Sequence, residues 1–330
     1  MVILRCVQRR ECLRLLSHLD GQRFGHVSLT PQVSKSFPPL SQANSIPTGV
    51  RYRQTVNADG ELKQLLYLPP FGPLCDPRLL ADIAAEAEAA GWDGIFLWDH
   101  VLRRREEVID IADPWVCLSA MAMTTSTIRI GPLVTPLTRR RPIKLAREIV
   151  TLDHLSLGRL TMGFGLGVDT GGELTRFGEE ADQRIRADRL DEGLTILDQL
   201  LVAGHADFHG EHFQVDDVMF GPRPVQQPRP PYWFAIRGTA QRPARRAAKY
   251  EGLIPIEMDV DAIKRLVDVI GELRGSLDGF DVVVSDTEGI GPDASEAEMV
   301  AAGATWITRR VPVGATASDV CELIKRTARG

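Results

Sequence analysis

Eight short apolar runs, each followed by a turn and then by a helical pattern, occupy the chain from Leu65 onward. Eight successive strand–helix units predict a closed parallel barrel with its helices outside, the α/β fold known as the (β/α)8 or TIM barrel. The runs are apolar on both faces, as expected of strands buried between a barrel interior and a helical layer. We expect the strands at Leu66–Phe71, Gly94–Trp98, Ile128–Val134, Leu160–Phe164, Tyr232–Ile236, Leu253–Ile256, Phe280–Val284 and Thr305–Ile307.

Prolines mark several boundaries of this pattern. Asp76 and Asp113 each precede a proline, an arrangement in which the acid caps a helix and the proline occupies its first turn. A polar stretch before strand five ends at Pro222 and the prolines that follow it. We therefore expect an excursion from the barrel before strand five.

The first 62 residues differ in composition from the rest of the chain. They hold eight Lys or Arg against four Asp or Glu, with scattered Ser, Gln and Pro and no sustained period. We expect residues 1–62 to form a basic, disordered extension. Residues 63–330 then form one barrel domain, since a barrel of this type needs roughly 250 residues.

Charge and cysteine content narrow the choice of partners. The chain has a net charge of -5, and its acidic part is the predicted barrel, which argues against nucleic acid or an anionic membrane as the main partner. No apolar run reaches the roughly 20 residues of a membrane span. Five widely spaced cysteines without a Cys-x-x-Cys indicate reduced thiols and a cytoplasmic protein. A small-molecule enzyme remains.

In a parallel barrel the chemistry lies where the strands end, so the residues after each apolar run are the candidates for function. Strand two ends in Trp98-Asp99-His100. An imidazole titrates near neutral pH and a neighbouring carboxylate can orient it, which makes Asp99 and His100 candidate catalytic residues. The alternative is a capping aspartate beside a histidine that is bonded to backbone.

The exits of strands three to five are rich in glycine and proline. Gly131 to Pro136 cannot sustain regular pairing, so we expect a bulge there. Gly163 to Gly167 lets the backbone approach a flat ring or a phosphate, or simply makes a turn. After strand five, the segment Ile236 to Thr239 leads into an arginine-bearing helix and suits an anionic group.

Other clusters carry weaker signals. Arg139 to Arg141 could reach an anionic cofactor tail, although a solvated face is the interpretation we favour. His205, His209 and His212 lie in the excursion with nothing to fix a zinc geometry, so we expect no metal. Glu257 and Asp286 could form a glycosidase pair, but caps or solvated acids explain them better.

Several ordered segments carry a resemblance to a known family: Leu68–Gly72, Ala89–Gly94, Trp98–His100, Arg129–Pro132, Leu145–Glu148, Leu152–Ser156, Gly158–Leu160 and Gly163–Gly167. Through these segments the chain resembles the luciferase-like flavin-dependent oxidoreductases, the bacterial luciferase class of barrel enzymes. Two segments depart from the class pattern, Arg237–Gly238 after strand five and Thr308–Arg310 at the end of the last strand.

The resemblance implies a flavin across the barrel mouth. Its ring would contact the bulge at Leu133 and Val134, where relatives often carry a non-prolyl cis peptide. His100 with Asp99 resembles the active-site pair of the deazaflavin-using branch. The cofactor-binding residues expected on this basis are Leu133, Val134, Gly165, Gly167, Ala235, Arg237, Gly238 and Thr239.

Two chemistries compete within this class. We favour a monooxygenase that uses reduced FMN and O₂ on a small organic substrate over the alternative, a hydride-transferring dehydrogenase or reductase that uses the deazaflavin coenzyme F420. A carboxylate-pair glycoside hydrolase is a remote third candidate. The electron donor would be a separate flavin reductase or NAD(P)H, and we expect a homo-oligomer.

Overall fold

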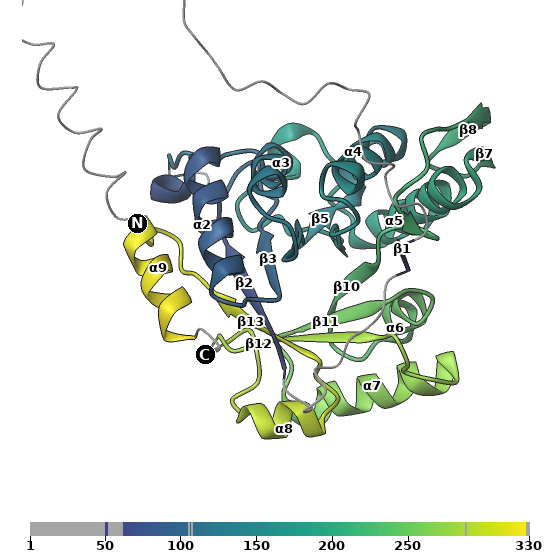
Figure 1. Ribbon diagram of the computed structural model, residues 1–330. Helices are drawn as coiled ribbons and strands as arrows, with labels where there is room; N and C mark the ends of the chain where they lie inside the picture. The colour runs from purple at the N-terminus through teal and green to yellow at the C-terminus, as the bar shows by residue number, and fades with distance from the viewer. Residues whose placement is uncertain (1–49, 52–61, 105, 107, 288, 328–330) are drawn as a thin grey trace, which may run out of the picture. The chain divides into compact units, whose positions relative to one another are not determined.

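Parallel strands joined by helices make up the computed structural model (Figure 1), which describes residues 50–51, 62–104, 106, 108–287 and 289–327. The principal sheet has nine strands in the order β4-β3-β2-β13-β12-β11-β10-β6-β5, all pairs parallel. The strands are β2 (Lys63–Leu68), β3 (Gly94–Leu97), β4 (Arg129–Pro132), β5 (Thr135–Pro136), β6 (Met162–Gly165), β10 (Tyr232–Arg237), β11 (Gly252–Ile256), β12 (Asp281–Ser285) and β13 (Trp306–Arg310).

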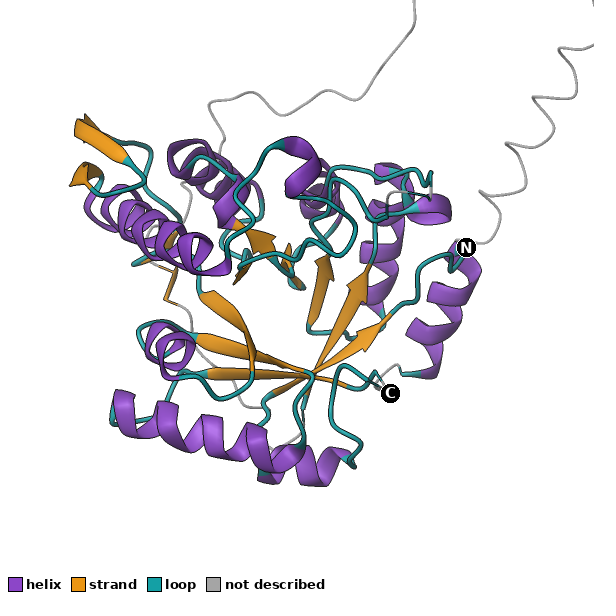
Figure 2. Cartoon of the chain, turned by 180° about the vertical axis from the view of Figure 1, so that it is seen from behind, coloured by secondary structure: helices purple, strands orange, loops and turns teal. Residues whose placement is uncertain are grey.

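The predicted barrel is confirmed, because the two edge strands of this sheet are neighbours in the chain: β4 lies within predicted strand three and β5 follows directly after that strand. β4 pairs with β3 and β5 pairs with β6, and a further parallel bridge joins Ile130 to Leu160. The sheet therefore curls round to meet itself, and the carboxyl ends of all its strands meet at one end of the barrel. Figure 2 shows the helices outside the strands.

The bulge expected in strand three separates β4 from β5. The peptide bond between Leu133 and Val134 is cis, and the amide of Leu133 donates to the carbonyl of Leu97 at 2.8 Å. The Tyr67 hydroxyl donates to the Leu133 carbonyl. A Cβ atom on Gly131 would lie 1.9 Å from the Thr161 carbonyl oxygen, so only glycine fits where the broken strand passes β6.

The helices begin largely where the sequence signals predicted. The side chain of Asp76 accepts from the amide of Arg78, and that of Asp113 accepts from the amides of Trp115 and Val116. The helices are α2 (Pro77–Ala89), α3 (Pro114–Thr124), α4 (Pro142–Leu155), α5 (Gln183–Asp198), α6 (Gln241–Ala247), α7 (Val260–Arg274), α8 (Glu296–Ala301) and α9 (Ala317–Arg326). Shorter turns are η3 (Gly72–Leu74), η4 (Leu137–Arg139), η5 (Thr175–Phe177) and the π-helical η6 (Gln199–Ala203).

The predicted excursion before strand five is an antiparallel hairpin. Strands β7 (His205–His209) and β8 (Gln214–Met219) pair with each other and project beyond α5 (Figure 1). After it, β9 (Gln226–Gln227) pairs in parallel with β1 (Val50–Arg51). These two residues of β1 and Leu62 are the described part of the predicted extension, and the rest of residues 1–62 lies outside the described residues.

Large side chains fill the barrel interior below its mouth. Phe96 and Trp233 stack with ring centroids 5.3 Å apart, and Trp306 meets Trp233 edge-on at the same separation. These rings are fully buried, together with Leu65 and Val283. The lower barrel is thus a packed core.

Candidate functional site

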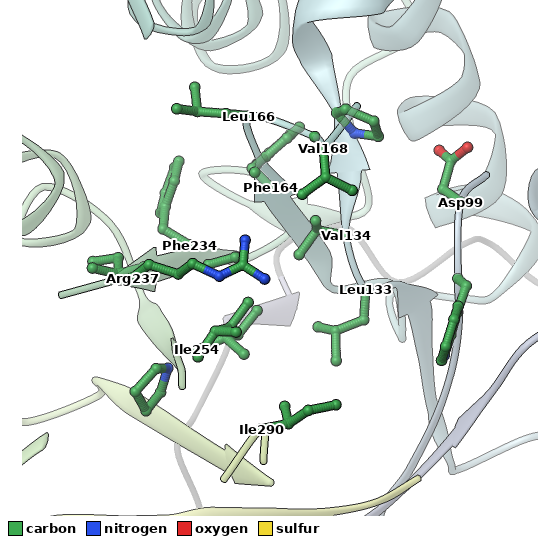
Figure 3. A pocket seen from close by; sticks show the side chains of 18 of the residues that line it. Asp99, Leu133, Val134, Phe164, Leu166, Val168, Phe234, Arg237, Ile254 and Ile290 are labelled. Atoms are coloured by element: carbon green, nitrogen blue, oxygen red, sulfur yellow. The ribbon is translucent and has the colours of Figure 1, made fainter. Parts of the chain in front are cut away.

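A cavity of about 430 Å³ opens at the carboxyl ends of the strands (Figure 3). Its size falls within the range of small-molecule sites, roughly 300–1,000 Å³. Its walls are apolar where Leu133, Val134 and Phe164 lie, and Figure 3 shows Asp99 and Arg237 on opposite sides of these residues. The cavity lies where the strand count predicted the site.

The structure brings most of the predicted cofactor-binding residues together around this cavity. Gly238 and Thr239 are exposed beyond the exit of β10 and are not among the residues that line it. The lining includes Leu133, Val134, Gly165, Gly167, Ala235 and Arg237.

Gly165 has a structural reason to be glycine. A Cβ atom built there would lie 2.8 Å from Cγ2 of Val134. The missing side chain therefore lets β6 pass the bulge, whether or not a ring also lies against it.

Asp99 is a buried carboxylate held by arginines, and it does not contact His100 through its side chain. Only 4% of Asp99 is exposed. Its oxygens accept from Arg140 at 2.8 and 2.9 Å, from Arg139 at 2.9 Å and from the Thr135 hydroxyl at 2.7 Å. Asp99 therefore ties the exit of β3 to the segment after β4, a positioning contact that the sequence pattern did not show.

The carboxylate partner of His100 is Glu173, which lies 73 residues further along the chain. Nδ1 of His100 lies 2.9 Å from Oε2 of Glu173, and the other oxygen accepts from the amide of Val101 at 2.5 Å and lies 3.2 Å from Arg139. Burial acts to raise the pKa of Glu173, but His100, Arg139 and the amide together hold that pKa below its usual range. Glu173 is therefore an anion at neutral pH.

His100 has one ring nitrogen left for a ligand. Its Nδ1 faces the Glu173 carboxylate, which favours the tautomer with the proton on Nδ1. Among the described residues, none bonds to Nε2, and His100 lines the cavity with about a quarter of its side chain exposed. Nε2 can therefore accept a proton from a molecule in the cavity.

The arginine run after the bulge is largely buried, contrary to the solvated face that we favoured. Only 6% of the Arg139 side chain and 19% of the Arg140 side chain are exposed. Arg139 pairs with both Asp99 and Glu173, and Arg140 pairs with Asp99. Arg141 is the exposed member of the run. The sequence could not show this, since the two acids come from other strand exits.

The arginines expected to form an anion site at α6 are mostly occupied by acids. Arg242 and Arg246 pair with Asp191 of α5 at 2.7 and 2.5 Å. Arg237 pairs with Glu257 at 3.0 Å on the exposed rim of the cavity. Of the two acids considered for a glycosidase, Glu257 is thus tied to Arg237, and Asp286 is tied to Arg309 at 2.9 Å.

The histidines of the excursion lie on the projecting hairpin. His205 pairs with Asp217 at 2.7 Å and His209 with Asp207 at 3.2 Å. No group of three or more metal-ligating side chains that could hold an ion is found in the described part of the chain. No helix among the described residues is both long enough and apolar enough to cross a membrane.

The family model described as luciferase-like monooxygenase matches residues 57–322. The chain belongs to this family. Its members share the barrel described above, so the fold and the resemblance seen in the sequence agree.

Curated relatives match about half of the chain. An F420-dependent glucose-6-phosphate dehydrogenase of Amycolatopsis mediterranei is 32% identical over 175 residues, 52% of this chain and 51% of that protein. An F420-dependent hydroxymycolic acid dehydrogenase of Mycobacterium tuberculosis is 30% identical over 197 residues, 57% of this chain and 51% of that protein. The chain spans about half the length of the curated relatives it matches.

Solved structures agree on the fold. An F420-dependent secondary alcohol dehydrogenase bound to an F420–acetone adduct superposes with a TM-score of 0.65 at 15% identity, over 82% of this chain and all of that one. The monooxygenase RslO1 of Streptomyces bottropensis gives 0.63 at 18% identity, over 81% of this chain and 98% of that one. At these identities the likeness concerns the fold alone.

Proposed function

We propose that this protein is an F420-dependent oxidoreductase that transfers hydride between the deazaflavin and an alcohol or its carbonyl product. The observation that carries the proposal is the His100–Glu173 pair at the cavity, whose free nitrogen can exchange a hydroxyl proton. The named relatives at 30% identity or more include F420-dependent dehydrogenases, which supports the deazaflavin over FMN. This reverses the preference drawn from the sequence.

The residues around the cavity fit a flat ring. Leu133 and Val134 present an apolar surface at the bulge, and Ala235 adds a small side chain on the facing strand β10. Tyr67 donates to the Leu133 carbonyl and so holds the bulge in place, and burial raises the pKa of its hydroxyl so that it stays a donor. When bound, the deazaflavin supplies hydride transfer without oxygen chemistry.

The chain's own part in the reaction is proton transfer and orientation. As an alcohol is oxidised, its carbon loses a hydride and its hydroxyl loses a proton, which Nε2 of His100 accepts. The buried Glu173 anion stabilises the imidazolium that forms, and it fixes the ring through Nδ1. Because the organic substrate supplies or receives the hydride, a separate flavin reductase has no part in this scheme.

Equilibrium titration of the full chain with F420 and, separately, with FMN tests the proposal. We expect F420 to saturate the chain at one molecule per chain and to bind at least tenfold more tightly than FMN. Tight binding of FMN without F420 binding would restore the monooxygenase function. If neither F420 nor FMN binds, the proposal that this cavity is a cofactor site is wrong.

A matched pair of variants tests where the cofactor lies. Ala235→Leu adds volume inside the cavity and should weaken F420 binding at least tenfold, about 1.4 kcal/mol. Ala301→Leu makes the same change on the exposed face of α8 and should leave the affinity unchanged. Equal affinities in the two folded variants would contradict the assignment.

A further inference from the structure

Arg310 stands out among the charged residues that line the cavity. It ends β13, and its guanidinium carbon lies 4.3 Å above the ring of Trp98, which comes from the exit of β3. Among the described residues, no carboxylate lies within ion-pair distance of its guanidinium and none forms a hydrogen bond with it. Burial lowers the pKa of Arg310; the neighbouring Tyr67 hydroxyl opposes this shift, and the charge of Arg103 adds to it.

The other charges around the cavity are already balanced. Asp99 is held by two arginines, and Glu173 by His100 and Arg139. Glu257 pairs with Arg237 at the rim. The described lining therefore carries a surplus positive charge at Arg310, and partly buried charges without partners are costly. Such a charge is typical of a site completed by an anionic ligand.

The position of Arg310 indicates whether the anionic group belongs to the substrate or to the cofactor. Trp98 contacts Arg310 on one side and lies 5.9 Å, ring to ring, from His100. Arg310 is thus on the same side of the cavity as the proton-accepting nitrogen. Arg237 lies across the cavity from this side, as Figure 3 shows relative to Asp99. One small molecule can reach both His100 and Arg310.

We propose that Arg310, stacked on Trp98, binds an anionic oxygen group of the substrate, a carboxylate or a phosphate, beside the carbon that exchanges hydride. This inference rests on the proposed function for the identity of the reaction. It adds a substrate class, small hydroxy or oxo compounds that carry an anionic group. The planar guanidinium suits both groups because it can donate two parallel hydrogen bonds.

Anion binding by the cofactor-free full chain is the first test. Phosphate and acetate are titrated calorimetrically at constant ionic strength with wild type, Arg310→Gln and the control Arg245→Gln, which removes one charge from an exposed site on α6. We expect wild type and the control to bind at least one of the two anions equally. Arg310→Gln should bind it at least tenfold more weakly. Equal binding by Arg310→Gln, or no saturable binding by wild type, would overturn the proposal.

The second test separates the substrate from the cofactor as the source of the anion. F420 affinity of Arg310→Gln should stay within twofold of wild type, and the F420-loaded chain should still bind the anion. Competition between the anion and F420, with weakened F420 binding by Arg310→Gln, would assign Arg310 to the cofactor and overturn the substrate role. A chain that binds the anion through Arg310 but binds no F420 would contradict the proposed function and leave the anion subsite standing.

A stability measurement guards against a purely structural role. Because Arg310 is a half-buried charge with no anionic partner among the described residues, replacing it by glutamine should leave the unfolding midpoint unchanged or raise it. A marked loss of stability would make Arg310 a packing residue. Arg310→Lys keeps the charge without the planar donor pair, so it should bind the anion between wild type and Arg310→Gln, which keeps the proposal testable if the glutamine variant unfolds.

Discussion

The two ends of the barrel differ in whether their buried polar groups are paired within the protein. At the amino-terminal end, which we call the floor, Asp281 accepts from the indole nitrogens of Trp306 at 2.9 Å and Trp233 at 3.1 Å. Nζ of Lys63 lies 4.9 Å from the centroid of the Trp306 ring, and Lys63 and Asp281 are both buried. Burial lowers the pKa of Lys63, and the charge of Asp281 opposes that shift. At the carboxyl end, the mouth, His100 and Arg310 each keep hydrogen-bonding capacity that no described residue uses.

This difference separates stability from function within one fold. In the floor, Asp281 accepts from two indoles and Lys63 stacks on one of them, so this arrangement stabilises the closed barrel. At the mouth, Glu173 holds His100 and Trp98 holds Arg310. Both His100 and Arg310 line the cavity. Barrel enzymes place their chemistry at this end because strand exits and loops converge there.

The largest expected effect lies in the floor. Asp281→Leu would leave two indole donors without their acceptor and remove the negative charge that offsets the burial of Lys63, so we expect a loss of about 3–5 kcal/mol in the free energy of unfolding. Asp281→Asn keeps one side-chain oxygen and should lose less. Urea denaturation measures both. Full stability of Asp281→Leu would show that the floor is not what holds the barrel closed.

At the mouth, His100→Ala should act on turnover instead of stability. With an alcohol that wild type oxidises, we expect turnover to fall by roughly 10²-fold or more, the usual effect of losing a general acid or base, with F420 affinity within a few fold. The control is His154→Ala, an imidazole bonded to the Arg223 carbonyl. If His100→Ala unfolds or keeps full turnover, His100 belongs with the structural residues.

Glu173→Gln distinguishes the two acids near His100. The Glu173 carboxylate holds the imidazole through Nδ1, so Glu173→Gln should lower turnover several-fold while F420 affinity stays within a few fold. Asp99→Asn should lower turnover less, since its carboxylate contacts Arg139 and Arg140 and not the imidazole. A loss of turnover in Asp99→Asn alone would return the orienting role to Asp99.

The smallest expected effect concerns Glu88, which accepts hydrogen bonds from three amides, Ser126 to Ile128, before β4. Burial opposes its ionisation, but these bonds prevail and lower the pKa of Glu88 to about 2. A depressed folded-state pKa contributes stability above the unfolded pKa that is lost as pH falls through the folded value. The stability difference between wild type and Glu88→Gln should therefore shrink from pH 5 to pH 2. Urea midpoints at each pH measure it, and a constant difference would contradict the stabilising role of the Glu88 carboxylate.

Local sequence patterns predicted the strands, the bulge and the end of the barrel at which the cavity lies, because each depends on neighbouring residues. Apolar runs locate strands, and Gly131 with Pro132 and Pro136 locates the break in strand three. The first strand begins three residues earlier than predicted, at Lys63 instead of Leu66. The apolar pattern missed this start because Lys63 is a polar residue that is buried in the floor.

The pairing of charges could not be predicted in the same way. Glu173 meets His100 across 73 residues, and nothing in its Gly-Gly-Glu segment marks it as a ligand of an imidazole. The arginines at 139 and 140 are buried only because Asp99 and Glu173 arrive from other strand exits. Such contacts depend on how the strand exits converge, which local periodicity does not encode.

Hydrogen–deuterium exchange of the full chain with and without F420 tests the central claim most directly, because it reports where the cofactor binds. F420 should slow amide exchange at the mouth, in residues 133–136, 163–168 and 235–237, and leave the floor strands around Asp281 unchanged. Saturating F420 that protects none of these mouth segments, or that protects another face of the chain instead, would contradict the account.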